Sequence, residues 1–172
     1  GLNEFCSSHK ELFEADVFIA SDGPRLQPDQ PTIFMGSRGV FNFAMTLNLR
    51  DGGHHSGNWG GLLANPGVIL SHALATIVDA KGQILVDGWK AAPMTNAVRQ
   101  ALAKLNVGGG DGGPEIDPSW GEPGLTAEEK VFGSNTFEIL AFETGNPRNP
   151  VNAVPPRAVA HGHIRFVAGS DP

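Results

Sequence analysis

Residues 40–61 read VFNFAMTLNLRDGGHHSGNWGG, a strongly alternating segment followed by a glycine-rich one. In the first half, apolar side chains occupy every second position, and these are Phe41, Phe43, Met45, Leu47 and Leu49. Polar side chains fill most of the positions between them, namely Asn42, Thr46, Asn48 and Arg50. A period of two with one apolar face predicts a strand of an antiparallel sheet, buried on one face and exposed on the other.

Two helices are predicted after this stretch. Asn65 and Pro66 supply an N-cap residue and a first-turn proline. The helix that they begin carries four apolar side chains on one side, which are Leu70, Leu74, Ile77 and Val78. A second helix is predicted within TNAVRQALAKLNVGGG (95–110), where apolar residues recur at helical spacing and glycines mark the end.

Four more segments have the composition of strands, and they are TIFMGSRG (32–39), ILVDGW (84–89), TFEILAFET (136–144) and AVAHGHIRFVAG (158–169). Residues 108–124, GGGDGGPEIDPSWGEPG, predict a long loop. The order of elements predicts an α+β fold in two layers, with helices on one face of an antiparallel sheet.

The N-terminal segment has a different character. Residues 2–14, LNEFCSSHKELFE, predict a short amphipathic helix. Residues 17–20 are a continuous apolar run, which predicts a strand buried on both faces, and residues 21–24 predict a turn. A helix, a buried strand and a polar turn together indicate a piece of an α/β layer, in which sites form at the carboxyl ends of strands.

Composition excludes several classes of function. The net charge of −6 and the lack of a basic stripe argue against nucleic-acid binding. No apolar run approaches the length of a membrane span and no secretory signal opens the chain, so no membrane partner is expected. Cys6 is the single cysteine, which favours a reducing, cytoplasmic setting. The GGGDGG run (108–113) lacks the lysine of a phosphate-binding loop, which argues against a nucleotide site.

The histidines leave several interpretations open. A histidine in a glycine-rich loop can be solvated, can cap a helix or can pack as a neutral ring, but it can also stabilise an oxyanion, transfer protons or bind a metal. His161 and His163 would point to one face of a strand and could bind a metal. Because no carboxylate or cysteine lies beside them in the sequence, we interpret them as polar strand residues.

The stretch DGGHHSGNWGGLLANP (51–66) resembles the D-x-x-x-H-S-G-x-x-G-G-x-x-x-x-P signature of the dinuclear zinc metallopeptidases, the family of carnosinase, cytosolic nonspecific dipeptidase and aminoacylase. Three further stretches resemble the family in the same order. They are ADVFIASDG (15–23), similar to a strand that ends in a zinc-binding aspartate, TIFMGSRG (32–39), similar to a G-x-R-G segment, and NAVPPRAVAHGHIRFVAGSDP (152–172), similar to its last conserved segment.

The resemblance implies a catalytic α/β domain that binds two zinc ions, with an inserted α+β lid or dimerisation domain of the ferredoxin-like type. Residues 1–24 would be the C-terminal piece of the first half of the catalytic domain. Residues 25–172 would be the lid domain, truncated at its C-terminal end. Zinc needs three or four protein ligands and one is matched here, so we expect this chain alone to bind no zinc tightly and to be inactive.

The resemblance also assigns roles to individual residues. Asp22 would be a zinc ligand. His55 would enter the active site of a partner subunit and hydrogen-bond the oxyanion that forms as zinc-activated water attacks the amide. Arg165 would grip the substrate carboxylate, and Asn152, which stands where the family has threonine, would contact the substrate.

The implied function is that of the lid of a cytoplasmic, homodimeric, zinc-dependent amidohydrolase that cleaves dipeptides or N-acyl amino acids. The alternating strand 41–49 would lie at a sheet edge, beside the helix 66–78, and pair with a second copy. Arg38 and His54 would be structural. The alternative is a stand-alone dimerisation or small-ligand-binding module without catalysis.

Overall fold

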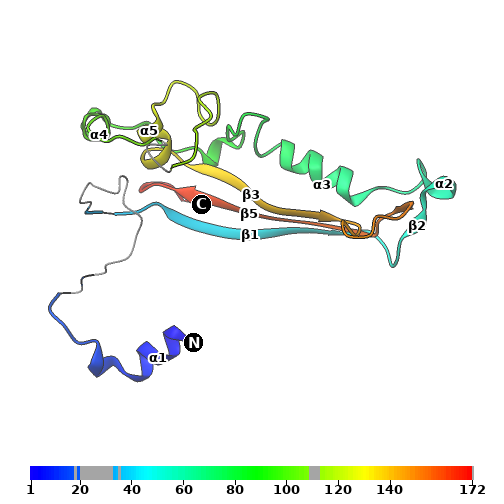
Figure 1. Ribbon diagram of the computed structural model, residues 1–172, viewed down its shortest axis with the longest axis horizontal. Helices are drawn as coiled ribbons and strands as arrows, with labels where there is room; N and C mark the ends of the chain where they lie inside the picture. Colours follow the sequence, from blue (N-terminus) through cyan, green and yellow to red (C-terminus); the bar gives the residue numbers. More distant parts are fainter. Residues whose placement is uncertain (18, 20–32, 35, 109–112, 172) are drawn as a thin grey trace. The chain divides into compact units, whose positions relative to one another are not determined.

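The computed structural model describes residues 1–17, 19, 33–34, 36–108 and 113–171 (Figure 1). The chain divides into two compact units, Gly1–Thr32 and Ile33–Pro172. The first unit contains α1 (Leu2–Ser8) and the 3-10 helix η1 (Lys10–Leu12), which confirms the predicted N-terminal helix in two short pieces.

The strand predicted at residues 17–20 is not observed at the two positions that the structure describes. Val17 and Ile19 belong to no strand, and their side chains are 73% and 85% exposed. A strand buried on both faces needs neighbouring strands, and the described residues of the first unit supply none. Phe18, Ala20 and the turn at residues 21–24 lie outside the described residues.

The second unit is built on a three-stranded antiparallel sheet in the order β1-β5-β3. Its strands are β1 (Gly39–Asn48), β5 (Arg157–Phe166) and β3 (Thr136–Thr144). All three were predicted. β1 alternates between half-buried and exposed positions from Phe43 to Asn48, whereas Phe41, which was expected on the buried face, is 51% exposed. Because β1 and β3 both run antiparallel to β5, they are parallel to each other, and the chain between them crosses one face of the sheet.

Two predicted strands are absent from the described residues. Residues 33–34 and 36–38 are irregular, and regular structure begins at Gly39. In the segment 84–89, Ile84 forms an isolated bridge to Val78, and the 3-10 helix η2 (Asp87–Trp89) follows. Both segments are too short for periodicity to separate a strand from an extended connection.

A small ribbon beyond the main sheet was not predicted. It pairs β2 (His54–His55) with β4 (Ala153–Val154) in antiparallel register, and the short helix α2 (Ser56–Trp59) follows β2 directly. Strands of two residues contain no repeating pattern that a sequence could display.

One helix, α3 (Pro66–Ala75), packs on one face of the sheet, and two further helices lie near the end where β3 begins (Figure 1). In α3, the Asn65 carboxamide oxygen accepts hydrogen bonds from the backbone N–H groups of residues 67 and 68, so the predicted cap is confirmed. The second predicted helix, α4 (Asn96–Leu102), ends before the glycines that were expected to stop it. The third helix, α5 (Ala127–Phe132), was not predicted. No helix in the described part of the chain is long and apolar enough to cross a membrane.

The core lies between α3 and the inner face of the sheet. Its buried residues come from α3, β3, β5 and the bridge, and they are Leu70, Leu74, Ile84, Phe137, Ala158, Ala160 and Ile164. Phe43 and Trp89 pack against Phe137, with ring centroids 5.8 Å and 6.2 Å from it. The predicted fold class, helices on one face of an antiparallel sheet, is confirmed.

Asn135 joins three parts of this unit. Its side chain is buried, and its Nδ2 donates to the Trp89 carbonyl oxygen and to the Ser170 hydroxyl, both at 2.9 Å. Its Oδ1 accepts from the Val167 backbone N–H at 2.9 Å. The Asn135 amide lies just before β3. It provides hydrogen-bond partners for a backbone group of η2 and for one in the segment after β5.

Asn135→Ala should lower the free energy of unfolding by roughly 2–4 kcal/mol, because it leaves a buried N–H and a buried carbonyl oxygen without partners. Urea denaturation of the 172-residue chain measures this change. Asn42→Ala removes an exposed amide from β1 and should stay within about 0.5 kcal/mol of the parent chain. Equal effects of the two substitutions would contradict the role assigned to Asn135.

Candidate functional site

The ribbon brings His55 and Asn152 together. His55 pairs with Ala153 across the ribbon. The next residue, Ser56, donates from its backbone N–H and from its hydroxyl to the Asn152 carbonyl oxygen, at 2.9 Å and 3.1 Å. Two of the residues predicted to act on substrate are therefore neighbours, although 97 positions separate them in the sequence.

The His55 ring is exposed and held in one tautomer. Its Nδ1 accepts a hydrogen bond from the Gly57 backbone N–H at 3.1 Å, which caps α2. A neutral imidazole carries its proton on one nitrogen only, so an accepting Nδ1 leaves the proton on Nε2. His55 thus presents an N–H donor on the side of the ring away from its own backbone, which is the group needed to stabilise an oxyanion.

Position 57 favours glycine because the His55 ring leaves no room for a side chain there, and its backbone angles do not require glycine. Its φ lies outside the left-handed region. A Cβ atom at this position would stand 2.8 Å from Cε1 and 3.0 Å from Nδ1 of His55. Any larger residue would therefore have to displace the imidazole ring.

His54 has a packing role in the structure. Its ring is half-buried and meets the Trp59 ring edge to face, with centroids 6.0 Å apart. Its Nδ1 is buried and has no hydrogen-bond partner among the described residues. His54 fixes the first turn of α2 against the ribbon while its neighbour His55 faces outward.

Arg165 lies at the opposite end of the sheet from His55. It is half-buried on the outer face of β5, where it pairs with Val40 of β1 and Thr136 of β3. It stands eight positions along β5 from Arg157, where the sheet ends on the ribbon side. At about 3.3 Å per residue this is roughly 26 Å, and the ribbon adds to it.

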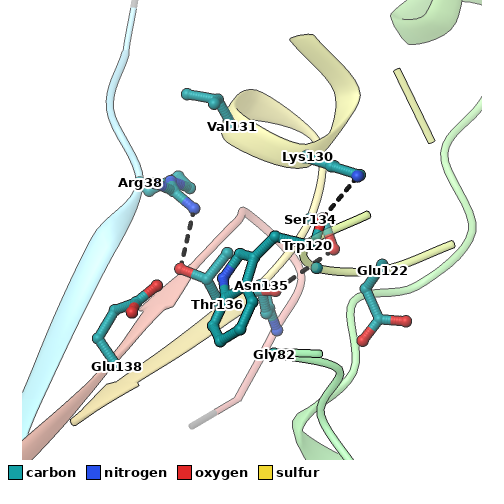
Figure 2. Close-up of a pocket in the computed structure, with 11 residues that line it drawn as sticks. Arg38, Gly82, Trp120, Glu122, Lys130, Val131, Ser134, Asn135, Thr136 and Glu138 are labelled. Carbon is teal, nitrogen blue, oxygen red and sulfur yellow. Dashed lines mark hydrogen bonds between the residues drawn. The ribbon is translucent and has the colours of Figure 1, made fainter. Parts of the chain in front are cut away.

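Arg38, which we expected to be structural, reaches the same end of the sheet as Arg165. Its Nη1 donates to the Thr136 hydroxyl at 3.3 Å (Figure 2). Burial lowers the pKa of Arg38, the nearby positive charge of Arg165 lowers it further, and Glu138 opposes the shift. A cavity of about 230 Å³ adjoins Arg38, Thr136 and Glu138.

The described residues do not fit a metal site. They contain no group of three or more His, Cys, Asp and Glu side chains that could hold an ion. Glu138 of β3 pairs directly with His163 of β5, which supplies the carboxylate neighbour that the sequence did not reveal, but His161, His163 and Glu138 do not form such a group. The predicted zinc ligand Asp22 lies outside the described residues.

Comparison with known proteins identifies the domain. Residues 35–172 match the family model described as "Peptidase dimerisation domain". The chain is 35% identical over 110 residues to the Beta-Ala-His dipeptidase of Rattus norvegicus, an alignment that covers 62% of this chain and 22% of that protein. It is 24% identical over 178 residues to the Cysteinylglycine-S-conjugate dipeptidase of Corynebacterium striatum, which covers 98% of this chain and 36% of that protein.

A solved structure agrees in fold. Human carnosine dipeptidase 1 superposes with a TM-score of 0.76 at 22% identity, covering 99% of this chain and 37% of that one. The chain thus spans between about a fifth and two fifths of the length of the proteins it resembles.

Gly57→Ala should displace the His55 ring and release Nδ1 from its hydrogen bond, because the new methyl group occupies the space of Cε1 and Nδ1. The ¹⁵N chemical shifts of His55 should report the Nε2–H tautomer in the parent chain and a mixture of tautomers in the variant.

Gly88→Ala is the matched control, because Gly88 has an ordinary φ and no atom within 4 Å of the position of a Cβ. It should leave the His55 resonances unchanged. Unchanged His55 shifts in Gly57→Ala would show that the ring tolerates the methyl group and that Gly57 does not hold it.

Proposed function

Because the chain belongs to the peptidase dimerisation domain family, we propose that it is the lid of a homodimeric, zinc-dependent dipeptidase of the cytoplasm. Its relatives are named for dipeptidase activity, Beta-Ala-His dipeptidase and Cysteinylglycine-S-conjugate dipeptidase, and these names support dipeptides as the substrate class. N-acyl amino acids have the same scissile amide beside a carboxylate, and we include them in the proposed substrate class. The single cysteine, Cys6, supports the cytoplasmic location.

The observation that carries this proposal is the exposed His55 ring, whose Nδ1 accepts a hydrogen bond from the Gly57 backbone N–H and leaves Nε2 as the donor of the neutral ring. When the amide of a dipeptide is attacked, negative charge develops on its carbonyl oxygen. An N–H donor that is already oriented stabilises that charge without the cost of reorganisation. Asn152 lies beside His55 and would contact the same substrate, while Arg165 would bind the substrate carboxylate.

Zinc dependence rests on the sequence resemblance, with Asp22 as the one proposed ligand in this chain. Since the described residues do not fit a metal site, we assign them the tasks of binding substrate and stabilising charge.

The separation of His55 and Arg165 supports action between subunits. An extended dipeptide spans about 7 Å. His55 and Arg165 lie more than roughly 26 Å apart along one sheet, so one dipeptide cannot reach both in the same chain. Both residues can act on one substrate molecule if a second copy supplies His55 and Asn152. Each copy then completes the site of the other, as two-fold symmetry requires.

Either edge of the described sheet could form the dimer. The strand predicted to be an edge, β1, lies at one edge, and β3 lies at the other. The β3 edge has three exposed apolar side chains, Ile139, Leu140 and Phe142, at 46%, 56% and 40%. The β1 edge has two, Val40 and Phe41, at 43% and 51%. Backbone groups on such an edge favour pairing with another strand, and apolar side chains add to the stability of that pairing. We propose that β3 pairs with its copy.

Ile139→Glu should shift the sedimentation velocity profile of the complete enzyme from dimer to monomer, because it buries a charge in the proposed interface. Val40→Glu is the matched control on the β1 edge, where Val40 is similarly exposed at 43%. The opposite result, with dissociation by Val40→Glu and none by Ile139→Glu, would place the interface at β1 instead.

His55→Ala in the complete enzyme should lower kcat by roughly a hundredfold to a thousandfold, the usual loss for one oxyanion donor. KM should change less than kcat, because the hydrogen bond strengthens as charge develops. Metal content should be unchanged, and the loss of stability should be no more than that of one helix cap, because the His55 Nδ1 accepts the capping hydrogen bond from the Gly57 N–H.

Mixing inactive His55→Ala with inactive Asp22→Ala enzyme tests action between subunits. A mixed dimer pairs an intact Asp22 with an intact His55 from the other chain, so activity should return in up to about half of its sites. If the subunits exchange and no activity returns, His55 does not act across the interface.

A further inference from the structure

Two arginines lie near Thr136 at the end of the sheet away from the ribbon, one through a side-chain hydrogen bond and the other as its register partner on β5. Arg165 on the outer face of β5 pairs with Thr136 of β3. Arg38, just before β1, donates to the Thr136 hydroxyl at 3.3 Å and so extends across the end of β5. Figure 2 shows the Arg38 guanidinium and the Glu138 carboxylate both directed toward this hydroxyl.

The charges at this end are not balanced. Within the described residues, no carboxylate lies within 4.0 Å of either guanidinium, and the influence of Glu138 on Arg38 is smaller than that of Arg165. Two other arginines have partners for their guanidinium groups. Arg99 forms a salt bridge with Glu129, and Arg50 donates to the carbonyl oxygens of Pro155 and Ala64. A half-buried arginine beside a second arginine is costly for the fold and is typical of a site prepared for an anion.

We propose that Arg38 and Arg165 together bind one carboxylate of the substrate, and that Arg38 is a second specificity-determining residue. This inference rests on the proposed function, in which Arg165 binds that carboxylate. The guanidinium groups of Arg38 and Arg165 and the carboxylate of Glu138 leave one net positive charge, which a single carboxylate neutralises. A dianion such as phosphate would exceed that charge and be repelled by Glu138. The cavity of about 230 Å³ that adjoins Arg38, Thr136 and Glu138 gives the ligand access to Arg38.

The test compares alanyl-alanine with its C-terminal amide as substrates of the complete enzyme. Arg38→Gln should raise KM for alanyl-alanine roughly 10-fold to 100-fold, the range for loss of a charge-assisted hydrogen bond, and should leave kcat within about threefold. KM for the uncharged amide should be unchanged. Arg38→Lys should recover only part of the loss, because an ammonium cannot make the bidentate contact.

Arg157→Gln is the matched control, because Arg157 lies on the same strand and the same outer face, is exposed and stands at the opposite end. It should alter neither substrate's KM. If Arg38→Gln raises KM equally for the acid and the amide, or for neither, Arg38 does not bind the carboxylate and the inference fails.

A second measurement does not depend on catalysis. N-acetylalanine, but not N-acetylalaninamide, should raise the melting temperature of the 172-residue chain at constant ionic strength, because it binds the folded state alone. Arg38→Gln should melt higher than the parent without ligand, since it removes repulsion, and should lose the response to N-acetylalanine. A lower melting temperature with an unchanged response would show that Arg38 is structural.

The two measurements separate this inference from the proposed function. A chain that responds to N-acetylalanine through Arg38, in a protein that cleaves no dipeptide, supports the carboxylate site and contradicts the dipeptidase. A complete enzyme that cleaves alanyl-alanine with no dependence on Arg38 supports the dipeptidase and overturns the carboxylate pair.

Discussion

The fold of the larger unit depends on the small side chains along the inner face of β5. Ala158, Ala160 and Gly162 occupy alternate positions there, and all three are buried. A Cβ at Gly162 would come within 3.1 Å of the Glu138 carbonyl oxygen and 3.2 Å of Phe43 Cζ. Because the central strand contributes so little volume, α3 and the aromatic rings of β1 and β3 can close over it at the packing density of a protein interior.

The same strand sets the distance between the two functional ends. β5 is the shared partner of β1 and β3, so it holds Arg165 beside the start of both strands. The chain enters β5 from the ribbon, where Asn152 accepts two hydrogen bonds from the residue after His55. A strand in the centre of the sheet keeps these ends apart, and this separation is the reason for proposing that two chains share one substrate.

The sequence predicted those features in which a local pattern repeats or a cap is present. The period of two in β1 and the Asn65–Pro66 start of α3 are local, so both were found. The α5 helix was missed although a local signal existed, since Thr126 and Glu129 form a capping box. The ribbon strands are too short to show a period. The convergence of Arg38 on Thr136 depends on the strand order, which places positions 98 residues apart side by side and leaves no trace in either segment.

Asn135 and Arg38 show two opposite uses of a polar group near the start of β3. The Asn135 amide is buried, and both its nitrogen and its oxygen have partners, as stability demands of a buried polar group. Arg38 lies just before β1, and its neighbours are the Thr136 hydroxyl and the positive charge of Arg165. The Asn135 amide has hydrogen-bond partners for both its nitrogen and its oxygen, whereas no carboxylate among the described residues forms a salt bridge with Arg38. The proposed substrate carboxylate would supply the missing negative charge.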